Sequence, residues 1–208
     1  MTDRDGVPVV AHYGSVSAEI AVTTKAAGLV DRSGVRQLAI AGEDPLVDQV
    51  LAAAVPGGGP GAGRAAAVAG TWCCRVTGSR AIVAGGTRAI GRWRQVASRT
   101  IATAGLDVRL DGLPEAAALS LVGPRAERIA LAAGLPAAVG VGEVAAGTVA
   151  GSPVTLVREP GDHFLLLFER GHPNEVWQAL WDAGHALGLA PVGNEALELL
   201  QASHRPLE

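Results

Sequence analysis

The feature that most constrains the fold of this chain is an order of strand, turn, strand and helix that occurs twice. In the second copy, residues 153–158 are rich in β-forming side chains, and residues 163–168 form a continuous apolar run. Pro160-Gly161 between them suits the two central positions of a type II turn. Pro173 then begins an amphipathic helix, which we expect Gly188 to end.

The first copy of this order lies earlier in the chain. Residues 75–83 again indicate two short strands around a turn, and a helix that carries Trp93 and Val96 follows them. Trp93 and Trp177, one in each expected helix, are separated by 84 positions. The chain therefore contains the same supersecondary unit twice.

A second pair of similar segments has nearly the same offset. Residues 119–124 resemble residues 38–42 at an offset of 81 positions, and a helix is expected after each segment. Two offsets this close indicate an old duplication. We therefore predict an α+β fold with duplicated, ferredoxin-like halves, at about residues 29–105 and 111–188, within a single domain that spans residues 1–208.

The segments before the first copy are expected to add further elements. Residues 17–27 predict a helix that Gly28 ends, and residues 29–34 predict a turn with a polar tip. Residues 35–41 alternate apolar and polar side chains, which predicts a half-buried strand. Pro45 suits the first turn of the helix that comes next.

The composition is typical of a globular protein without a bias towards nucleic acid or membranes. Of the 208 residues 49% are hydrophobic, and the formal net charge is −3. No apolar run approaches the ~20 residues that cross a bilayer, and the polar, acidic N-terminus does not resemble a signal peptide. Because the only cysteines, Cys73 and Cys74, are adjacent and have no other cysteine to pair with, we expect a reducing, cytoplasmic location.

The common motifs for metal, phosphate or nucleophile chemistry are missing. The five histidines are scattered, and the adjacent cysteines lack zinc-knuckle spacing. The glycine-rich residues 55–63 are not followed by the Gly-Lys-Ser/Thr of a phosphate loop, so a plain connector is favoured. Neighbouring residues of a strand alternate faces, so at most one of Cys73 and Cys74 can face a ligand. A buried thiol that acts as a small hydrophobe is favoured for both.

A few polar residues near the expected turns are candidates for a site. Asp31 and Ser33 are the most site-like pair of the first half, although capping of a turn explains them about equally well. Arg158 and Glu159 flank the turn of the second copy and are expected to be solvated, as is His163. The residues alone therefore predict no particular reaction.

Five segments resemble one enzyme family in the same order. Residues 12–19 and 26–33 are similar to the Tyr-Gly-Ser, Ala-Glu and Ala-Gly-Leu-x-Asp-x-Ser patterns of the glycine-cleavage T-protein (aminomethyltransferase) family. Residues 38–45, 121–126 and 187–193 resemble its Gly-x-Asp-Ala, Leu-x-Gly-Pro-x-Ala and Gly-Leu-x-Pro-x-Gly motifs. The resemblance implies the folate-binding fold of that family without its C-terminal β-barrel, tetrahydrofolate as the cofactor, and transfer of an aminomethyl or methyl group.

The functional positions of the family are occupied by other residue types. Cys73 and Cys74 stand where the resemblance places the catalytic Asp, so the catalytic residue is unknown, and whether a thiol replaces the acid stays open. Leu165 stands where a Glu pairs with the pterin ring, and residues 81–85 and 201–203 depart from two further motifs. Each unmet polar group of a buried pterin would cost about 1–3 kcal/mol, which predicts weakened folate binding.

Two functions follow from the resemblance. The first is a folate-binding, aminomethyltransferase-like enzyme with altered residues. The second is a non-catalytic partner subunit, similar to the gamma subunit of heterotetrameric sarcosine oxidase, whose partner would be a flavoprotein oxidase or another protein subunit. A third, a folate-binding protein of iron–sulfur assembly, is disfavoured because the Lys-Gly-Cys-Tyr-x-Gly-Gln motif is absent. For a ligand, the predicted contacts are Tyr13, Asp31, Arg158 and Glu159; no nucleic acid, membrane or metal is expected.

Overall fold

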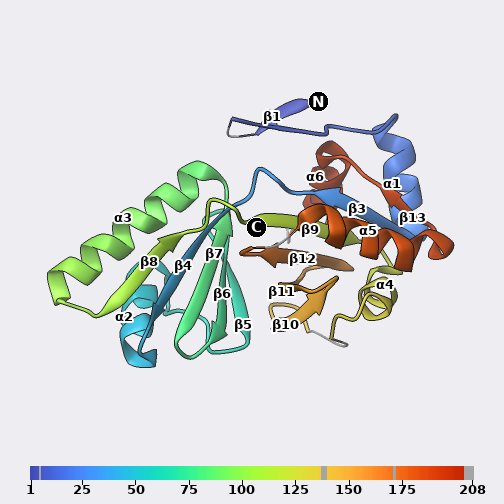
Figure 1. The fold of residues 1–208 in the computed structure, drawn as a ribbon. Coiled ribbons are helices and arrows are strands. Elements are labelled where there is room, and N and C mark those ends of the chain that lie inside the picture. The colour runs from blue at the N-terminus through green and yellow to red at the C-terminus, as the bar shows by residue number, and fades with distance from the viewer. Residues whose placement is uncertain (5, 137–139, 171, 204–208) are drawn as a thin grey trace. The chain divides into compact units, whose positions relative to one another are not determined.

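The computed structural model describes residues 1–4, 6–136, 140–170 and 172–203 and consists of two compact units (Figure 1). Unit 1 comprises Met1–Gly34 and the chain from Ala117 onward, and unit 2 comprises Val35–Ala116. Each unit contains a β-sheet with helices packed on it, so the predicted mixed α+β class is confirmed.

Unit 2 is built on a five-stranded antiparallel sheet in the order β5-β6-β7-β4-β8. Its strands are β4 (Arg36–Gly42), β5 (Arg64–Val68), β6 (Thr71–Thr77), β7 (Arg80–Gly85) and β8 (Val108–Gly112). The helices α2 (Asp44–Ala54) and α3 (Thr87–Ala104) pack on one face of this sheet.

The core of unit 2 follows from the apolar spacing of α3. Ile90, Trp93 and Ala97 lie on one side of the helix and pack against Leu38 and Val83 of the sheet. The indole of Trp93 is buried, and its Nε1 donates to Thr71 Oγ1 at 3.0 Å, which satisfies the only polar atom of that ring. The other residue named for this helix, Val96, lies outside the buried side.

Unit 1 is built on a six-stranded sheet in the order β10-β11-β12-β9-β3-β13. Its strands are β3 (Ala27–Asp31), β9 (Ala117–Val122), β10 (Val144–Val149), β11 (Ser152–Glu159), β12 (His163–Phe168) and β13 (Leu189–Pro191). All neighbours are antiparallel except β13 and β3, which are parallel. A separate short hairpin joins β1 (Thr2–Arg4) and β2 (Val7–Val9).

Helices cover both faces of the unit 1 sheet. The first face packs against α4 (Ala126–Ala132) and α5 (Pro173–Gly184), which a 3₁₀ turn, η1 (His185–Leu187), extends. On the second face, Val30 and Val122 pack against α1 (Val16–Lys25) and α6 (Asn194–Ser203). Alternation along the strands therefore directs each buried side chain to one of the two faces of the sheet.

The same order of elements occurs in both units. In unit 2, β4 is followed by α2, β5, β6, β7, α3 and β8, and in unit 1, β9 is followed by α4, β10, β11, β12, α5 and β13. The strand order β5-β6-β7-β4 corresponds to β10-β11-β12-β9. This arrangement is consistent with the predicted duplication, whose bounds stay a prediction.

The second copy has the predicted local structure. Gly161 has a φ of +77°, as the third residue of a type II turn requires, and every residue of β12 is buried. The helix begins at Pro173, and Gly188, with a φ of +80°, follows the 3₁₀ turn that ends it.

The predictions for residues 17–34 are partly wrong. The first helix ends at Lys25, and Gly28 lies in β3, where a Cβ would stand 2.7 Å from Val192 Cγ2. Gly28 is therefore required by close packing in the strand, and it does not end a helix. Leu29 and Val30 are buried strand residues and not part of a turn, because Leu29 packs in the first core and Val30 in the second. The predicted half-buried strand is β4, whose residues 38–40 are all buried.

Candidate functional site

Unit 1 brings two of the four predicted ligand contacts, Tyr13 and Asp31, close together. The carboxylate of Glu19 accepts hydrogen bonds from the backbone N–H of Tyr13 at 2.5 Å and of Gly193 at 2.8 Å. A side chain at position 193 would overlap the carbonyl of Ala11, so a glycine is required at this approach. Glu19, on α1, thus holds the N-terminal segment against the chain that enters α6.

Asn194 attaches the end of β3 to the same segment. Its Nδ2 donates to the carbonyl oxygen of Asp31 at 3.0 Å and to that of Val10 at 3.3 Å. The backbone N–H of Asn194 donates to Val10 as well. Tyr13 and Asp31 are therefore positioned by two buried polar side chains, Glu19 and Asn194, which the sequence analysis did not identify.

The electrostatics of this corner keep the phenol of Tyr13 protonated. Burial, followed by the negative charges of Asp31 and Glu19, raises the pKa of Tyr13 above its usual value of 10.0. The side chain is still 49% exposed, so its hydroxyl can donate to a ligand. Tyr13 thus offers a neutral hydrogen-bond donor beside a carboxylate.

Asp31 performs the turn-capping role that was one of its two interpretations. Its Oδ1 accepts from the backbone N–H of Ser33 at 2.9 Å and from the Ser33 hydroxyl. Its other carboxylate oxygen has no hydrogen bond to the residues that the structure describes. We refer to Tyr13 and Asp31, with this second oxygen, as the Tyr13–Asp31 corner.

Arg158 is not the solvated turn residue that was expected. Its guanidinium lies 4.6 Å from the centre of the Phe164 ring, and its Nη2 donates to Asp162 Oδ1 at 3.1 Å. Its Nη1 lies 3.6 Å from Glu127 Oε2 on α4. Because Phe164 belongs to the first core, the Arg158 side chain lies on the α4/α5 face of the sheet.

Glu159 and His163 are buried too, so the expectation that they are solvated is wrong. They are directly opposite each other on β11 and β12, and Glu159 Oε2 accepts from Gln201 Nε2 of α6 at 3.2 Å. Glu159 therefore faces α6, whereas its neighbour Arg158 faces α4 and α5. One ligand cannot contact both side chains from the same side of the sheet.

The helix α6 also separates Glu159 from Asp31. Its first residue, Asn194, binds the backbone of Asp31, and Gln201 binds Glu159. Seven residues of α-helix span roughly 10 Å. Among the four predicted contacts, only Tyr13 and Asp31 form a joint candidate site.

The second face of the unit 1 sheet is apolar at the position where the resemblance places a pterin-binding Glu. Register aligns Val30, Ser120, Leu165 and Val157 in one row across four strands, and all four are buried. The Ser120 hydroxyl is the only polar side-chain group of the row, and it already accepts from Arg32 Nη1 at 2.9 Å. This row therefore does not fit the donors of a pterin ring.

The two cysteines at the position of the predicted catalytic Asp lie on opposite faces of the unit 2 sheet. Cys73 packs in the α2/α3 core, whereas Cys74 lies on the other face of the sheet, opposite Ala65 and Ile82, so the predicted alternation is confirmed. Both thiols are free and buried. Burial raises the pKa of Cys73 to about 12, an effect that the charge of Arg75 opposes, so this thiol is protonated at neutral pH.

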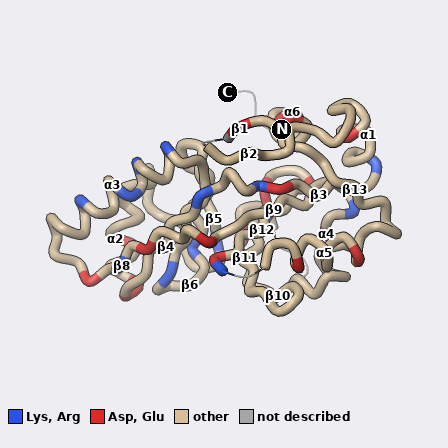
Figure 2. Tube along the Cα trace, turned by 45° about the horizontal axis from the view of Figure 1, so that its top comes forward, with Lys and Arg blue, Asp and Glu red and all other residues tan. Residues whose placement is uncertain are grey.

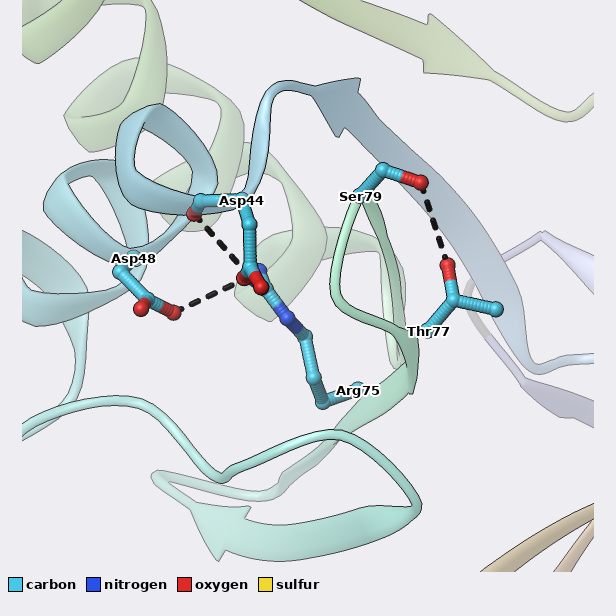
Figure 3. Close-up of polar contacts among 5 residues, drawn as sticks. All are labelled: Asp44, Asp48, Arg75, Thr77 and Ser79. Atoms are coloured by element: carbon cyan, nitrogen blue, oxygen red, sulfur yellow. Dashed lines mark hydrogen bonds and ion pairs between the residues drawn. The ribbon is translucent and has the colours of Figure 1, made fainter.

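An ion-pair cluster around the buried Arg75 of unit 2 was not predicted. Figure 3 shows Arg75 of β6 directed at Asp44 and Asp48 of α2; its Nη2 lies 2.5 Å and 3.0 Å from their carboxylate oxygens. A Cβ at Gly78, in the adjacent turn, would stand 2.5 Å from Asp44 Oδ2. Thr77 and Ser79 form a separate hydroxyl pair at 3.3 Å. The sequence signal for this cluster was the pair Asp44 and Asp48, which lie four residues apart at the start of a helix and so share one side of it.

The described residues contain no group of three or more His, Cys, Asp or Glu side chains that could hold a metal ion. No helix in the described ranges is long and apolar enough to cross a membrane. The candidate groups are the Tyr13–Asp31 corner, Arg158 and Glu159 at the β11–β12 turn, and Arg75 with its two aspartates. In this corner the Tyr13 hydroxyl and one carboxylate oxygen of Asp31 have no hydrogen-bond partner among the described residues.

Comparison with solved structures shows that the chain has the fold of glycine cleavage aminomethyltransferases. It is similar to the glycine cleavage system aminomethyltransferase T from Bartonella henselae, with a TM-score of 0.75 and 20% identity over 96% of this chain. The match covers 57% of that protein, so this chain spans a little over half its length. The predicted resemblance is confirmed at the level of the fold.

A second solved structure is the heterotetrameric sarcosine oxidase from Corynebacterium sp. U-96 in complex with pyrrole 2-carboxylate. One of its chains is similar with a TM-score of 0.67 and 21% identity, over 85% of this chain and 94% of that chain. No family model matches the sequence. No curated protein matches it either.

Proposed function

We propose that this chain is a cytoplasmic, non-catalytic subunit that keeps the aminomethyltransferase fold and binds a partner protein. The observation that carries the proposal is the chemistry at the positions where the resemblance places carboxylates. Leu165 lies there in an apolar row, and Cys73 has a thiol whose pKa is raised to about 12. Without a carboxylate, these positions cannot stabilise the positive charge of a reacting folate amine.

The similarity to a subunit of a heterotetrameric oxidase supports a partner of the same kind. The match extends over 94% of that chain, so the likeness is to nearly the whole subunit. The partner would be a flavoprotein oxidase or another protein subunit. The two free cysteines support a reducing location.

A second candidate is a tetrahydrofolate-binding protein with residual one-carbon (aminomethyl or methyl) transfer. The Tyr13–Asp31 corner favours it, because a protonated phenol and an unpaired carboxylate oxygen offer a donor and an acceptor to a polar ring. Tetrahydrofolate would supply the carrier for the one-carbon unit. Tyr13 would donate and Asp31 would accept, while no described residue is assigned as the catalytic acid.

Two experiments separate these functions. The tagged full chain, expressed in the native host organism, should co-purify stoichiometrically with a flavoprotein oxidase. Purification of the chain without any partner would refute the subunit proposal. Calorimetry of the pure chain with tetrahydrofolate should show no binding. Binding at micromolar ligand that Tyr13→Phe and Asp31→Asn both weaken would instead establish the folate function.

A further inference from the structure

The exposed side of α3 carries a stripe of arginines. Arg88, Arg92, Val96 and Arg99 are four, four and three positions apart, so they lie on one side of the helix, away from Ile90, Trp93 and Ala97, the residues on its buried side. All four are exposed, and basic positions recur along α3 in Figure 2. We call these four residues the arginine stripe.

The stripe has no acidic counterpart on its own helix. Thr87–Ala104 contains four arginines and no Asp or Glu, whereas the whole chain has a net charge of −3. Arg88, Arg92 and Arg99 form no ion pair with any described residue. The fourth arginine, Arg94, lies over Gly112 and is not part of the stripe.

These arginines do not stabilise α3 by themselves. Arg88 lies in the first turn, where the helix dipole disfavours a positive charge. Arg88 and Arg92 are four positions apart on the helix surface, so their like charges repel each other. The positive charge is therefore better explained by an interaction outside the helix than by the stability of the helix.

We propose that the arginine stripe is a docking surface for an acidic patch on a partner protein. This inference rests on the proposed subunit function and names the surface that would be used. The three guanidinium groups are distributed over the twelve residues from Arg88 to Arg99, whose eleven steps span roughly 16 Å of helix. A matching partner presents carboxylates along that length.

The exposed valine favours a protein over a nucleic acid as the partner. Val96 is 37% exposed and lies between Arg92 and Arg99, where an apolar side chain of a partner can cover it. A phosphate backbone offers no such contact.

The test uses a fluorescent, glutamate-rich helical peptide with a central leucine as the probe. The full chain is compared with the triple variant R88A/R92A/R99A and with a control triple, R36A/R128A/R170A, whose arginines are also exposed. Both triples change the formal net charge from −3 to −6, because each removes three positive charges. A difference in peptide affinity between the two triple variants therefore reports where the arginines lie and not the total charge of the chain.

We expect the stripe variant to bind the peptide roughly tenfold more weakly, since three surface ion pairs together approach the ~1.4 kcal/mol of a tenfold change. The control triple should bind as the wild type does, and added salt should weaken both. Val96→Asp should weaken binding, and Val22→Asp, at a valine that is 39% exposed on α1, should not. Equal melting temperatures would show that the variants are folded.

Three results would overturn the proposal: no binding of the peptide by the wild type, an equal loss in both triples, or tighter binding of duplex DNA or anionic vesicles than of the peptide. Co-purification separates this inference from the proposed function. If the oxidase partner binds wild type and stripe variant equally, the stripe is not its docking surface but the subunit function stands. If no partner co-purifies while stripe-dependent peptide binding persists, the subunit proposal fails and the acidic-surface inference remains.

Discussion

Arg75 allows the energetic cost of a buried charge in unit 2 to be predicted. Its side chain is 1% exposed, whereas those of its partners Asp44 and Asp48 are 64% and 65% exposed. Its Nη1 has no hydrogen-bond partner among the described residues. Because Arg75 is buried and its two partners are exposed, removing the arginine and neutralising the aspartates should change the free energy of unfolding by different amounts.

Neutralising the acids should destabilise the chain more than removing the arginine. Loss of the partner of a fully buried ion costs about 3–5 kcal/mol, and an exposed pair contributes about 0–1 kcal/mol. Since water already screens Asp44 and Asp48, we expect the D44N/D48N variant to lose about 2–3 kcal/mol, between these limits. The asparagines preserve side-chain shape and an acceptor oxygen, so the loss reports mainly the charge.

The variant R75M should be more stable than D44N/D48N. Methionine fills much of the space of the arginine stem, and the two aspartates that remain are solvated. We expect its free energy of unfolding to lie within about 1 kcal/mol of the wild type. Adding R75M to D44N/D48N should therefore restore most of the lost stability, because the uncompensated cation is gone.

Urea unfolding followed by circular dichroism measures these differences, with the slope of the transition expected to stay unchanged. The control is the exposed pair of Arg109 and Asp111 in the same unit, 2.6 Å apart with side chains 72% and 41% exposed. Its neutralisation should change stability by less than about 0.5 kcal/mol. If R75M proves less stable than D44N/D48N, or the triple variant is no better than the double, the reasoning about the buried charge is refuted.

Three further predictions concern unit 1 and the cysteine pair. Gly28→Ala should lower the urea midpoint, corresponding to about 1–3 kcal/mol, because its Cβ would overlap Val192; unchanged stability would contradict the packing argument. The thiol of Cys73 should resist alkylation in the native chain and react after unfolding. Because its folded pKa is about 12 and the ordinary value is 9.0, the unfolded state loses its proton first, so this group should lower stability as pH rises above about 9. In an ultraviolet titration Tyr13, the one tyrosine of the sequence, should ionise above 10.0, and Asp31→Asn should bring its pKa closer to that value. If the substitution leaves the pKa of Tyr13 unchanged, the proposed electrostatic contact between Tyr13 and Asp31 is refuted.

Local chemistry made much of the second copy predictable. Pro160-Gly161 defines a turn by backbone preference alone, and the apolar run after it can be buried only as an inner strand. Pro173 and Gly188 mark the two ends of one helix and its 3₁₀ extension. These features depend on neighbours within a few residues, which a sequence displays directly.

The strand β3 was missed because its partners are remote in the chain. Leu29 pairs with Leu121, and the parallel neighbour of Ala27 is Leu189. A five-residue strand with four apolar residues before Asp31, between a helix and a polar turn, carries no periodicity of its own. The same reason explains the site: Tyr13 and Asp31 are brought together by Glu19 and Asn194, one of which lies near the far end of the sequence.

The replacement of site residues is itself consistent with the way the unit 1 sheet is packed. Leu165 lies between Ser120 and Val157 in a buried row, where a leucine contributes about 1.5–3 kcal/mol of hydrophobic stabilisation. A glutamate in that row would have the hydroxyl of Ser120, already bonded to Arg32, as its only side-chain hydrogen-bonding neighbour in the row. A buried carboxylate is tolerated when a function requires it, and otherwise an apolar residue is more stable. Arg88 and Arg92 of α3 show the opposite balance, since a positive charge in the first turn and a pair of like charges do not stabilise the helix. The apolar row around Leu165 and the unpaired arginines of α3 are thus both consistent with the proposed subunit function.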